Sequence, residues 1–328
     1  MLKSKFGCTG LEVSRLTMGC GAVGGLMTKG AARDQDYAVH WARDNGINFF
    51  DTAASYGDGA SETNLGRALQ GNTKGLVVST KVGIKQSDLG DVSGAVERSM
   101  NDSLKRLQLD NVDLLQLHNT VGHSDRHGSI AADQLFTEVA KAFEKIRAAG
   151  KARFFGFTAK GEPDVLTQWV KSGTFNSAQI FYNLLVPSAG ETPADNYPAE
   201  DYQCLLDTAL ENGVGAIGVR VLAGGALSGS EKRNPLGMPV VIPIGANTDY
   251  AQDVKLALQF MPLIEEGVAS SLTELAIRYV ISNPALPTTE IGIANIEELQ
   301  GAADAINKGP LSEEGLGRVR QIQAAFCS

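Results

Sequence analysis

The feature that most constrains the fold of this 328-residue chain is a repeated alternation of short apolar runs and helical patterns. Eight runs have the composition of buried strands, and they lie at residues 16–20, 47–51, 76–81, 112–118, 153–158, 177–182, 215–220 and 289–293. Helical patterns fill most intervals, at 32–45, 61–69, 92–107, 131–149, 163–172, 199–212, 249–266, 271–282, 296–306 and 312–326. This alternation predicts an α/β fold, a closed parallel (β/α)8 TIM barrel in one domain spanning residues 1–328.

Two segments at the ends of the chain stand outside the repeating pattern. Residues 3–14 have the pattern of a short β-hairpin, with its turn at Gly7–Gly10. Such a hairpin is expected to close the N-terminal mouth of the barrel. The helical pattern at 312–326 predicts an extra C-terminal helix.

Polar side chains stand at the ends of three consecutive predicted strands. The second strand run leads into Asp51, and Tyr56 follows five residues later. The third run ends in Lys81, and the fourth ends in His118. Because sites in this fold lie at the C-terminal ends of the strands, we expect these four side chains to meet.

The four residue types together suit acid–base chemistry at a carbonyl group. A phenol has an ordinary pKa of about 10, and a nearby ammonium group lowers that pKa by stabilising the phenolate. A carboxylate beside the ammonium keeps it charged and fixed, and an imidazole can donate a hydrogen bond to a carbonyl oxygen. Asp51, Tyr56, Lys81 and His118 are therefore predicted to be catalytic.

Each of these residues also has an ordinary structural interpretation. Taken singly, Asp51 is typical of a helix cap and Tyr56 of a loop anchor. Lys81 is typical of a solvated strand end, and His118 of a buried core histidine. Their ordered appearance at consecutive strand ends favours a shared site.

The same motifs resemble those of the aldo-keto reductase superfamily over nearly the whole chain. The resemblance is carried by Asp51-Thr52-Ala53 with Tyr56-Gly57, by Lys81, and by residues 114–118, Leu-Leu-Gln-Leu-His. Further matching fragments lie at 10–14, 18–21, 179–185, 227–229 and 291–295. Gly156-Phe157-Thr158 is similar to the branch that contains L-galactose and other sugar dehydrogenases.

The resemblance implies an NAD(P)(H)-dependent oxidoreductase that interconverts an aldehyde or ketone and its alcohol. It further implies cofactor contacts at Gly21, Thr158, Gln179, Arg220, Leu222, Gly225, Leu227, Gly229, Gly292, Ala294, Asn295 and Glu298. Substrate contacts are implied at Ala22, Leu26 and Asn119. The glycine-rich 21–27 loop lacks the GxGxxG spacing of a dinucleotide turn, and the long 186–198 loop is expected to border the substrate pocket.

The chain departs from the common family pattern at the cofactor. Thr158-Ala159 replaces a Ser-Asn pair, and Val219 stands where a tyrosine often stacks on the nicotinamide. Residues 288–307 contain no arginine or lysine, and two carboxylates, Glu297 and Glu298, stand where a basic or neutral residue is common. These carboxylates favour NAD(H) over NADP(H), because a carboxylate repels the 2′-phosphate.

Two features leave the dinucleotide preference open. Glu298 stands three residues after Asn295, a spacing typical of a helix cap. Lys232 or Arg233 could also reach a phosphate from the loop after the seventh strand.

Three alternative functions remain open. The same four residues can oxidise a sugar lactol to a lactone. A barrel of this kind can also bind nucleotide as a sensor or partner subunit with little turnover. A Schiff-base aldolase would use Lys81, but would leave Tyr56 and Asp51 without a clear role.

Composition excludes several classes of partner. The net charge of −8, without a basic stripe, argues against nucleic-acid binding, and no apolar run approaches a membrane span of roughly 20 residues. Four scattered cysteines (Cys8, Cys20, Cys204 and Cys327) and the lack of a signal peptide indicate a reducing compartment, by default the cytoplasm. His123 and His127 have HxxxH spacing but lie in a polar loop without an evident third ligand, so no metal is expected. The sequence does not specify the oligomeric state.

Overall fold

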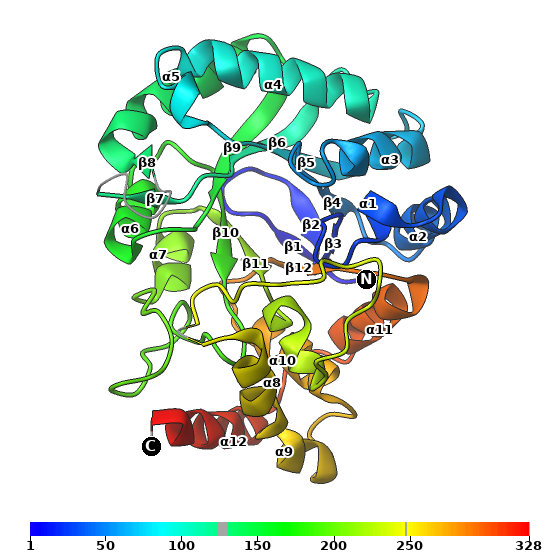
Figure 1. The fold of residues 1–328 in the computed structure, drawn as a ribbon, viewed down its shortest axis with the longest axis vertical. Coiled ribbons are helices and arrows are strands. Elements are labelled where there is room, and N and C mark those ends of the chain that lie inside the picture. The colour runs from blue at the N-terminus through cyan, green and yellow to red at the C-terminus, as the bar shows by residue number, and fades with distance from the viewer. Residues whose placement is uncertain (124–129, 247, 328) are drawn as a thin grey trace.

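The computed structural model describes residues 1–123, 130–246 and 248–327. Eight parallel strands close into a barrel in the order β10-β11-β12-β3-β4-β5-β6-β9, which confirms the predicted fold (Figure 1). The strands are β3 (Leu16–Gly19), β4 (Phe49–Asp51), β5 (Val77–Val82), β6 (Val112–Leu117), β9 (Ala152–Thr158), β10 (Ser177–Phe181), β11 (Gly215–Val219) and β12 (Thr288–Gly292). Each lies within about two residues of its predicted range.

Most predicted helices form and pack around the strands. They are α2 (Ala32–Asp44), α3 (Ala60–Leu69), α4 (Val92–Leu107), α5 (Ala132–Ala148), α6 (Pro163–Lys171), α10 (Leu272–Ile281), α11 (Ile296–Asn307) and α12 (Glu313–Ala324). Side-chain caps fix several N-termini, as at α4, where the Asp91 carboxylate accepts a hydrogen bond from the backbone N–H of Gly94. No helix in the described ranges is long and apolar enough to cross a membrane.

Two helical predictions were wrong in extent. The pattern at 199–212 forms only α7 (Leu205–Glu211), because Gln203 and Cys204 have φ angles of 53° and 52°, outside the range of a right-handed helix. The pattern at 249–266 forms two helices, α8 (Tyr250–Leu258) and α9 (Met261–Glu265). Pro262 stands in the first turn of α9, where its missing N–H costs nothing, and it could not continue α8.

Short elements that the sequence did not indicate occupy several loops. They are α1 (Leu26–Lys29), η1 (Gln86–Asp88), β7 (Val121–Gly122), β8 (Ile130–Ala131), η3 (Ala223–Ser228) and η4 (Ala325–Cys327). In Figure 1, α8, α9 and α12 gather on one side of the barrel, at the bottom of the view.

The predicted N-terminal hairpin forms from β1 (Lys3–Lys5) and β2 (Glu12–Ser14), which pair antiparallel. Phe6 and Val13 are fully buried in one cluster with the barrel residues Phe49, Leu114 and Ile217. The Phe6 and Phe49 rings meet edge to face at 5.7 Å between centroids. The hairpin therefore closes the N-terminal end of the barrel with an apolar layer, as expected.

Candidate active site

The strand ends bring the four predicted catalytic residues together. Asp51 is the last residue of β4 and lies opposite Ser79 in the register with β5. Lys81 lies near the end of β5, and His118 directly follows β6. Gly57 and Gly59, with φ of 61° and 86°, turn the chain after Tyr56 into α3.

A buried ion pair joins Asp51 and Lys81. Their side chains are 0% and 1% exposed, and the Lys81 ammonium donates a hydrogen bond to Asp51 Oδ2. Asp51 Oδ1 also accepts from the Ser79 hydroxyl and, at 3.1 Å, from Gln116 Nε2. Lys81 donates to the Thr52 carbonyl oxygen at 2.9 Å. Burial alone would lower the pKa of Lys81, but the Asp51 carboxylate raises it well above its usual range, so Lys81 stays charged.

Tyr56 lies directly on this pair. The Lys81 ammonium donates to the Tyr56 hydroxyl at 3.2 Å. Burial raises the pKa of Tyr56 to about 12 and outweighs Lys81, which lowers it, while Glu290 and Asp51 raise it further. The effect of Lys81 has the predicted direction, but the net shift is upward, so Tyr56 carries its proton at neutral pH.

His118 faces Tyr56 from the end of the next strand. The two rings meet edge to face with 5.8 Å between centroids and 87° between planes. Burial, with Lys81 and Lys160 nearby, lowers the pKa of His118 to about 3. The imidazole is therefore neutral at physiological pH, with one N–H available as a donor.

A cavity of about 1050 Å³ opens over this group. Its lining begins at Tyr56 and His118 and continues along α11 as far as Lys308. Ligand pockets in proteins usually have a volume of about 300–1,000 Å³, so this cavity can hold a large ligand together with a small one.

Buried polar groups line the inner end of the cavity. The Thr158 hydroxyl donates to Gln179 Oε1 at 2.8 Å, and Gln179 Nε2 donates to Glu290 Oε2 at 2.7 Å. Thr158 and Gln179 are both predicted cofactor contacts, and both line the cavity. Glu290 was not among the residues predicted from the sequence, although it alternates with Thr288 and Gly292 along β12, a spacing that points all three to one face of the strand.

The outer end of the cavity is suited to a pyrophosphate. Gly224 and Gly225 have φ angles of 69° and 113°, and a Cβ on Gly225 would approach Arg233 Nη1 to 3.1 Å. The N-terminus of α11 also lies at the cavity. The predicted cofactor contacts at the inner end and the glycine backbone at the outer end together fit a dinucleotide.

The cap at the start of α11 forms as its sequence indicates. Asn295 Oδ1 accepts from the Glu298 backbone N–H at 2.9 Å, and Glu298 Oε2 accepts from the Ala294 N–H at 2.8 Å. Glu298 therefore both caps the helix and lines the cavity.

Thirteen of the nineteen predicted site residues lie along this cavity. They are Gly21, Ala22, Tyr56, His118, Thr158, Gln179, Arg220, Leu222, Gly225, Gly292, Ala294, Asn295 and Glu298. Asp51 and Lys81 lie directly beneath Tyr56.

Four predicted contacts lie outside the cavity lining within the described part of the chain. Leu26 and Leu227 are buried in the hydrophobic core. Gly229 ends η3. The Asn119 side-chain amide accepts a hydrogen bond from the Ile84 backbone N–H and donates one to the Ile84 carbonyl oxygen, each at 2.8 Å. Asn119 therefore fixes the loop after β5.

The 186–198 loop does not border this cavity, contrary to expectation. Its Glu191 accepts hydrogen bonds from the Tyr279 hydroxyl at 2.7 Å and from Arg320 at 2.9 Å, which hold the loop against α10 and α12. The cavity is instead bordered by the 232–238 segment, whose Arg233 donates to the Gly224 carbonyl oxygen at 2.6 Å and to the Met238 carbonyl oxygen at 2.7 Å.

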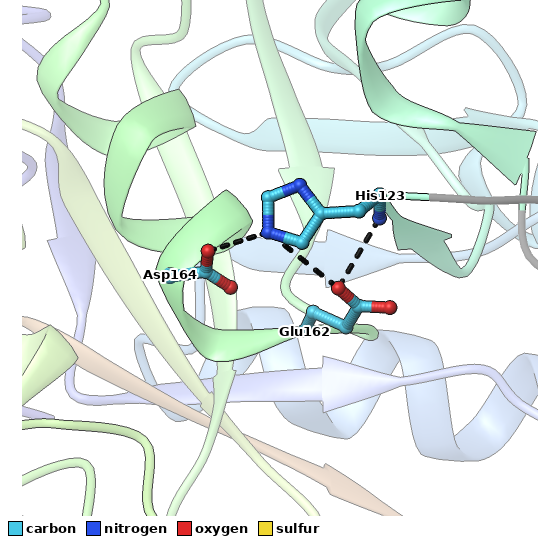
Figure 2. Close-up of side chains that lie close together, drawn as sticks. All are labelled: His123, Glu162 and Asp164. Carbon is cyan, nitrogen blue, oxygen red and sulfur yellow. Dashed lines mark hydrogen bonds and ion pairs between the residues drawn. The ribbon is translucent and has the colours of Figure 1, made fainter.

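One cluster in the described residues has the composition of a metal site. His123, Glu162 and Asp164 lie together on the surface, as Figure 2 shows. His123 Nε2 pairs with Asp164 at 2.5 Å and lies 3.7 Å from Glu162. This hydrogen bond raises the pKa of His123. All three side chains are exposed, and His123 pairs with both carboxylates, which links the loop after β7 to the start of α6. His127 lies outside the described residues.

The chain is similar over most of its length to known proteins. A profile described as Aldo/keto reductase family matches residues 15–324. L-galactose dehydrogenase of Arabidopsis thaliana is 29% identical over 325 residues, covering 96% of this chain and 92% of that protein. D-threo-aldose 1-dehydrogenase of a Pseudomonas species is 29% identical over 250 residues, covering 68% of this chain and 70% of that protein.

A solved structure has the same fold over the whole chain. The aldo-keto reductase AKR11C1 from Bacillus halodurans, in its holo form, superposes with a TM-score of 0.68 and 26% identity. The match covers 100% of this chain and 97% of that one.

Proposed function

Because the chain belongs to the aldo/keto reductase family and is an NAD(P)-dependent oxidoreductase, we propose that it interconverts an aldehyde or ketone and its alcohol with Tyr56 as the general acid or base. The observation that carries this proposal is the 3.2 Å hydrogen bond from the buried Lys81 ammonium to the Tyr56 hydroxyl, in the wall of the large cavity. A bound nicotinamide dinucleotide would supply or accept the hydride.

The proton is handled by Tyr56 and its partners. In the direction of reduction, the neutral Tyr56 phenol donates its proton to the carbonyl oxygen as that oxygen gains negative charge. The Lys81 ammonium then stabilises the phenolate, and Asp51 keeps the ammonium in place. The neutral His118 imidazole donates a hydrogen bond that orients the same oxygen.

Oxidation of a sugar lactol to a lactone is the second candidate activity. It uses the same residues in reverse, with Tyr56 accepting the hydroxyl proton. Two relatives are named as dehydrogenases of sugars, L-galactose dehydrogenase and D-threo-aldose 1-dehydrogenase, and this supports the candidate.

The burial of Lys81 argues against a Schiff-base mechanism. Its ammonium is charged, 1% exposed and paired with Asp51 beneath Tyr56. A Schiff-base lysine needs a neutral amine that the substrate can reach.

We further propose that NAD(H) is the preferred dinucleotide. Glu297 and Glu298 line the cavity at the start of α11, where they would repel a 2′-phosphate. Lys308, which also lines the cavity, is paired with Glu274 at 2.6 Å. Arg233 is engaged with backbone carbonyl oxygens and holds its own loop.

A substrate panel tests the proposed activity. Aldehydes, ketones and aldoses are each assayed with NADH, NADPH, NAD⁺ and NADP⁺, for wild type and for Tyr56→Phe. We expect turnover that falls about 10²–10⁴-fold in Tyr56→Phe, with unchanged dinucleotide binding. Near-normal turnover of Tyr56→Phe would remove the phenol from the mechanism. Dinucleotide binding without conversion of any substrate would favour a nucleotide-binding subunit, and borohydride trapping of a substrate adduct would favour an aldolase.

A further inference from the structure

Glu290 is a second carboxyl group at the inner end of the cavity, and the acid–base mechanism does not use it. It lies on β12, opposite Thr17 in the register with β3, and it lines the cavity. Its side chain packs against Gly19 so closely that a Cβ there would lie 3.0 Å from Glu290 Oε1. The position is therefore sterically defined, and Glu290 faces the space above the barrel interior.

Glu290 lies between Gln179, a predicted cofactor contact, and the buried ion pair of Asp51 and Lys81. Its Oε2 accepts a hydrogen bond from Gln179 at 2.7 Å, and its carboxyl group lies close enough to the Asp51 carboxylate for the two to interact electrostatically. Two carboxyl groups thus share the neighbourhood of one ammonium, Lys81, which is already paired with Asp51. Burial and the Asp51 carboxylate hold the pKa of Glu290 well above its usual range.

A carboxyl group in this position responds to a positive charge placed beside it. For hydride transfer, the nicotinamide ring would have to lie next to the substrate carbon whose oxygen is hydrogen-bonded to Tyr56, in the part of the cavity that Gln179 and Glu290 line. The oxidised nicotinamide ring carries a positive charge, and the reduced ring is neutral. A cation close to a carboxyl group favours its ionised form.

We propose that Glu290 couples cofactor redox state to a proton: it releases its proton to solvent when the oxidised dinucleotide binds and keeps it when the reduced dinucleotide binds. The proposal rests on the use of a nicotinamide dinucleotide and is independent of the substrate. Its consequence is that rising pH strengthens binding of the oxidised form alone, which favours the oxidative direction.

The other titratable groups facing Glu290 do not change protonation in the same pH range. Burial raises the pKa of Cys20, which directly follows β3, far above neutrality, and it raises the pKa of Tyr56 to about 12. Lys81 on β5 stays charged, paired with Asp51 on β4. Gln179, from β10, is neutral at every pH.

Two groups at the cavity wall lie farther along the same surface. Arg220 remains a cation throughout. His118, with a pKa of about 3, remains neutral above pH 5. Among the groups that face it, Glu290 is thus the one expected to release a proton when the oxidised ring binds.

The test measures dissociation constants of the oxidised and reduced dinucleotides from pH 6 to 9 by calorimetry, with the NAD or NADP pair that binds more tightly. In wild type, we expect the ratio of the oxidised to the reduced constant to fall by about tenfold or more over this range, with a slope of at most about tenfold per pH unit because one proton is released. In Glu290→Gln, which keeps the size of the side chain and a hydrogen bond to Gln179, the ratio is expected to be independent of pH.

Three controls isolate Glu290 as the source of the proton. ADP-ribose, which lacks the nicotinamide ring, should bind wild type with no pH dependence of this kind. Tyr56→Phe should keep the wild-type pH dependence, because the phenol is not the source. In wild type, mixing with the oxidised dinucleotide in weak buffer should release up to one proton per site, and mixing with ADP-ribose should release none.

The outcomes separate this proposal from the proposed activity. A wild-type ratio that does not vary with pH, or a pH dependence that survives in Glu290→Gln, overturns the role of Glu290 and leaves the oxidoreductase activity standing. A pH dependence lost in Tyr56→Phe assigns the proton to the phenol and also overturns it. If no dinucleotide binds, the oxidoreductase activity is refuted, and the role of Glu290 is refuted with it.

Discussion

Replacing Lys81 with methionine should destabilise the protein in a way that depends on pH. The Lys81→Met change removes the ammonium from a pair whose side chains are 1% and 0% exposed. Asp51 would then be a buried carboxylate without a counter-ion, keeping its hydrogen bonds from Ser79 and Gln116. A group in this position takes up a proton rather than remain charged.

The cost of that proton sets the size of the effect. A carboxyl group has an ordinary pKa of about 3.9, so holding it protonated at pH 7 costs about 4 kcal/mol, at about 1.4 kcal/mol per pH unit. At pH 5 the same step costs about 1.5 kcal/mol. The folded variant therefore holds a proton that the unfolded chain releases, so the lost stability grows as pH rises above about 4.

Thermal unfolding followed by circular dichroism measures this difference. With an unfolding entropy of about 2.1 cal/mol/K per residue, the midpoint should fall by about 6 °C at pH 7 and about 2 °C at pH 5. The double variant Asp51→Asn/Lys81→Met removes both charges and should recover most of the loss. Lys105→Met, on the exposed face of α4, should change stability by less than about 0.5 kcal/mol.

The result that would refute this reasoning is an equal fall in midpoint at the two pH values. It would mean that Lys81 stabilises the protein by packing and not by neutralising Asp51. Turnover should fall about 10²–10⁴-fold in the single and double variants alike, because the phenol loses its charged partner in each.

Three further predictions concern the cofactor, the loops and the surface. Glu298→Arg should shift the ratio of kcat/KM for NADH and NADPH about tenfold toward NADPH, because repulsion of about 1 kcal/mol or more between the carboxylate and the 2′-phosphate becomes attraction. A wild type that already prefers NADPH tenfold contradicts the argument that the Glu298 carboxylate disfavours the 2′-phosphate. Gly25→Ala should lower the thermal midpoint, because its φ is 90° and a Cβ would lie 1.9 Å from the Leu236 carbonyl oxygen; an unchanged midpoint would show that the 232–238 segment moves freely. In an NMR titration His123 should show a midpoint above 6.5 that falls toward the ordinary value in Asp164→Asn, because the paired carboxylate raises its pKa; equal midpoints would exclude the ion pair.

The sequence by itself determined the barrel and the order of its strands. Buried strands must be apolar on both faces, and surface helices must repeat their apolar positions at helical spacing, so both leave local patterns that can be read directly. The acid–base residues could also be predicted from the sequence, because Asp51, Lys81 and His118 stand at the ends of strands whose apolar patterns are local. The cap joining Asn295 and Glu298 is equally local, because it spans three residues.

Only the tertiary structure decided which loops border the cavity and what the buried charges do. The 186–198 loop has the composition of a binding loop, but Tyr279 and Arg320, distant in sequence, hold it against α10 and α12. The upward shift of the Tyr56 pKa likewise depends on burial, which no local pattern records. The role proposed for Glu290 depends on Asp51 and Gln179, which lie 239 and 111 positions away in the chain. These residues come together only in the closed barrel, in which β12 pairs with β3.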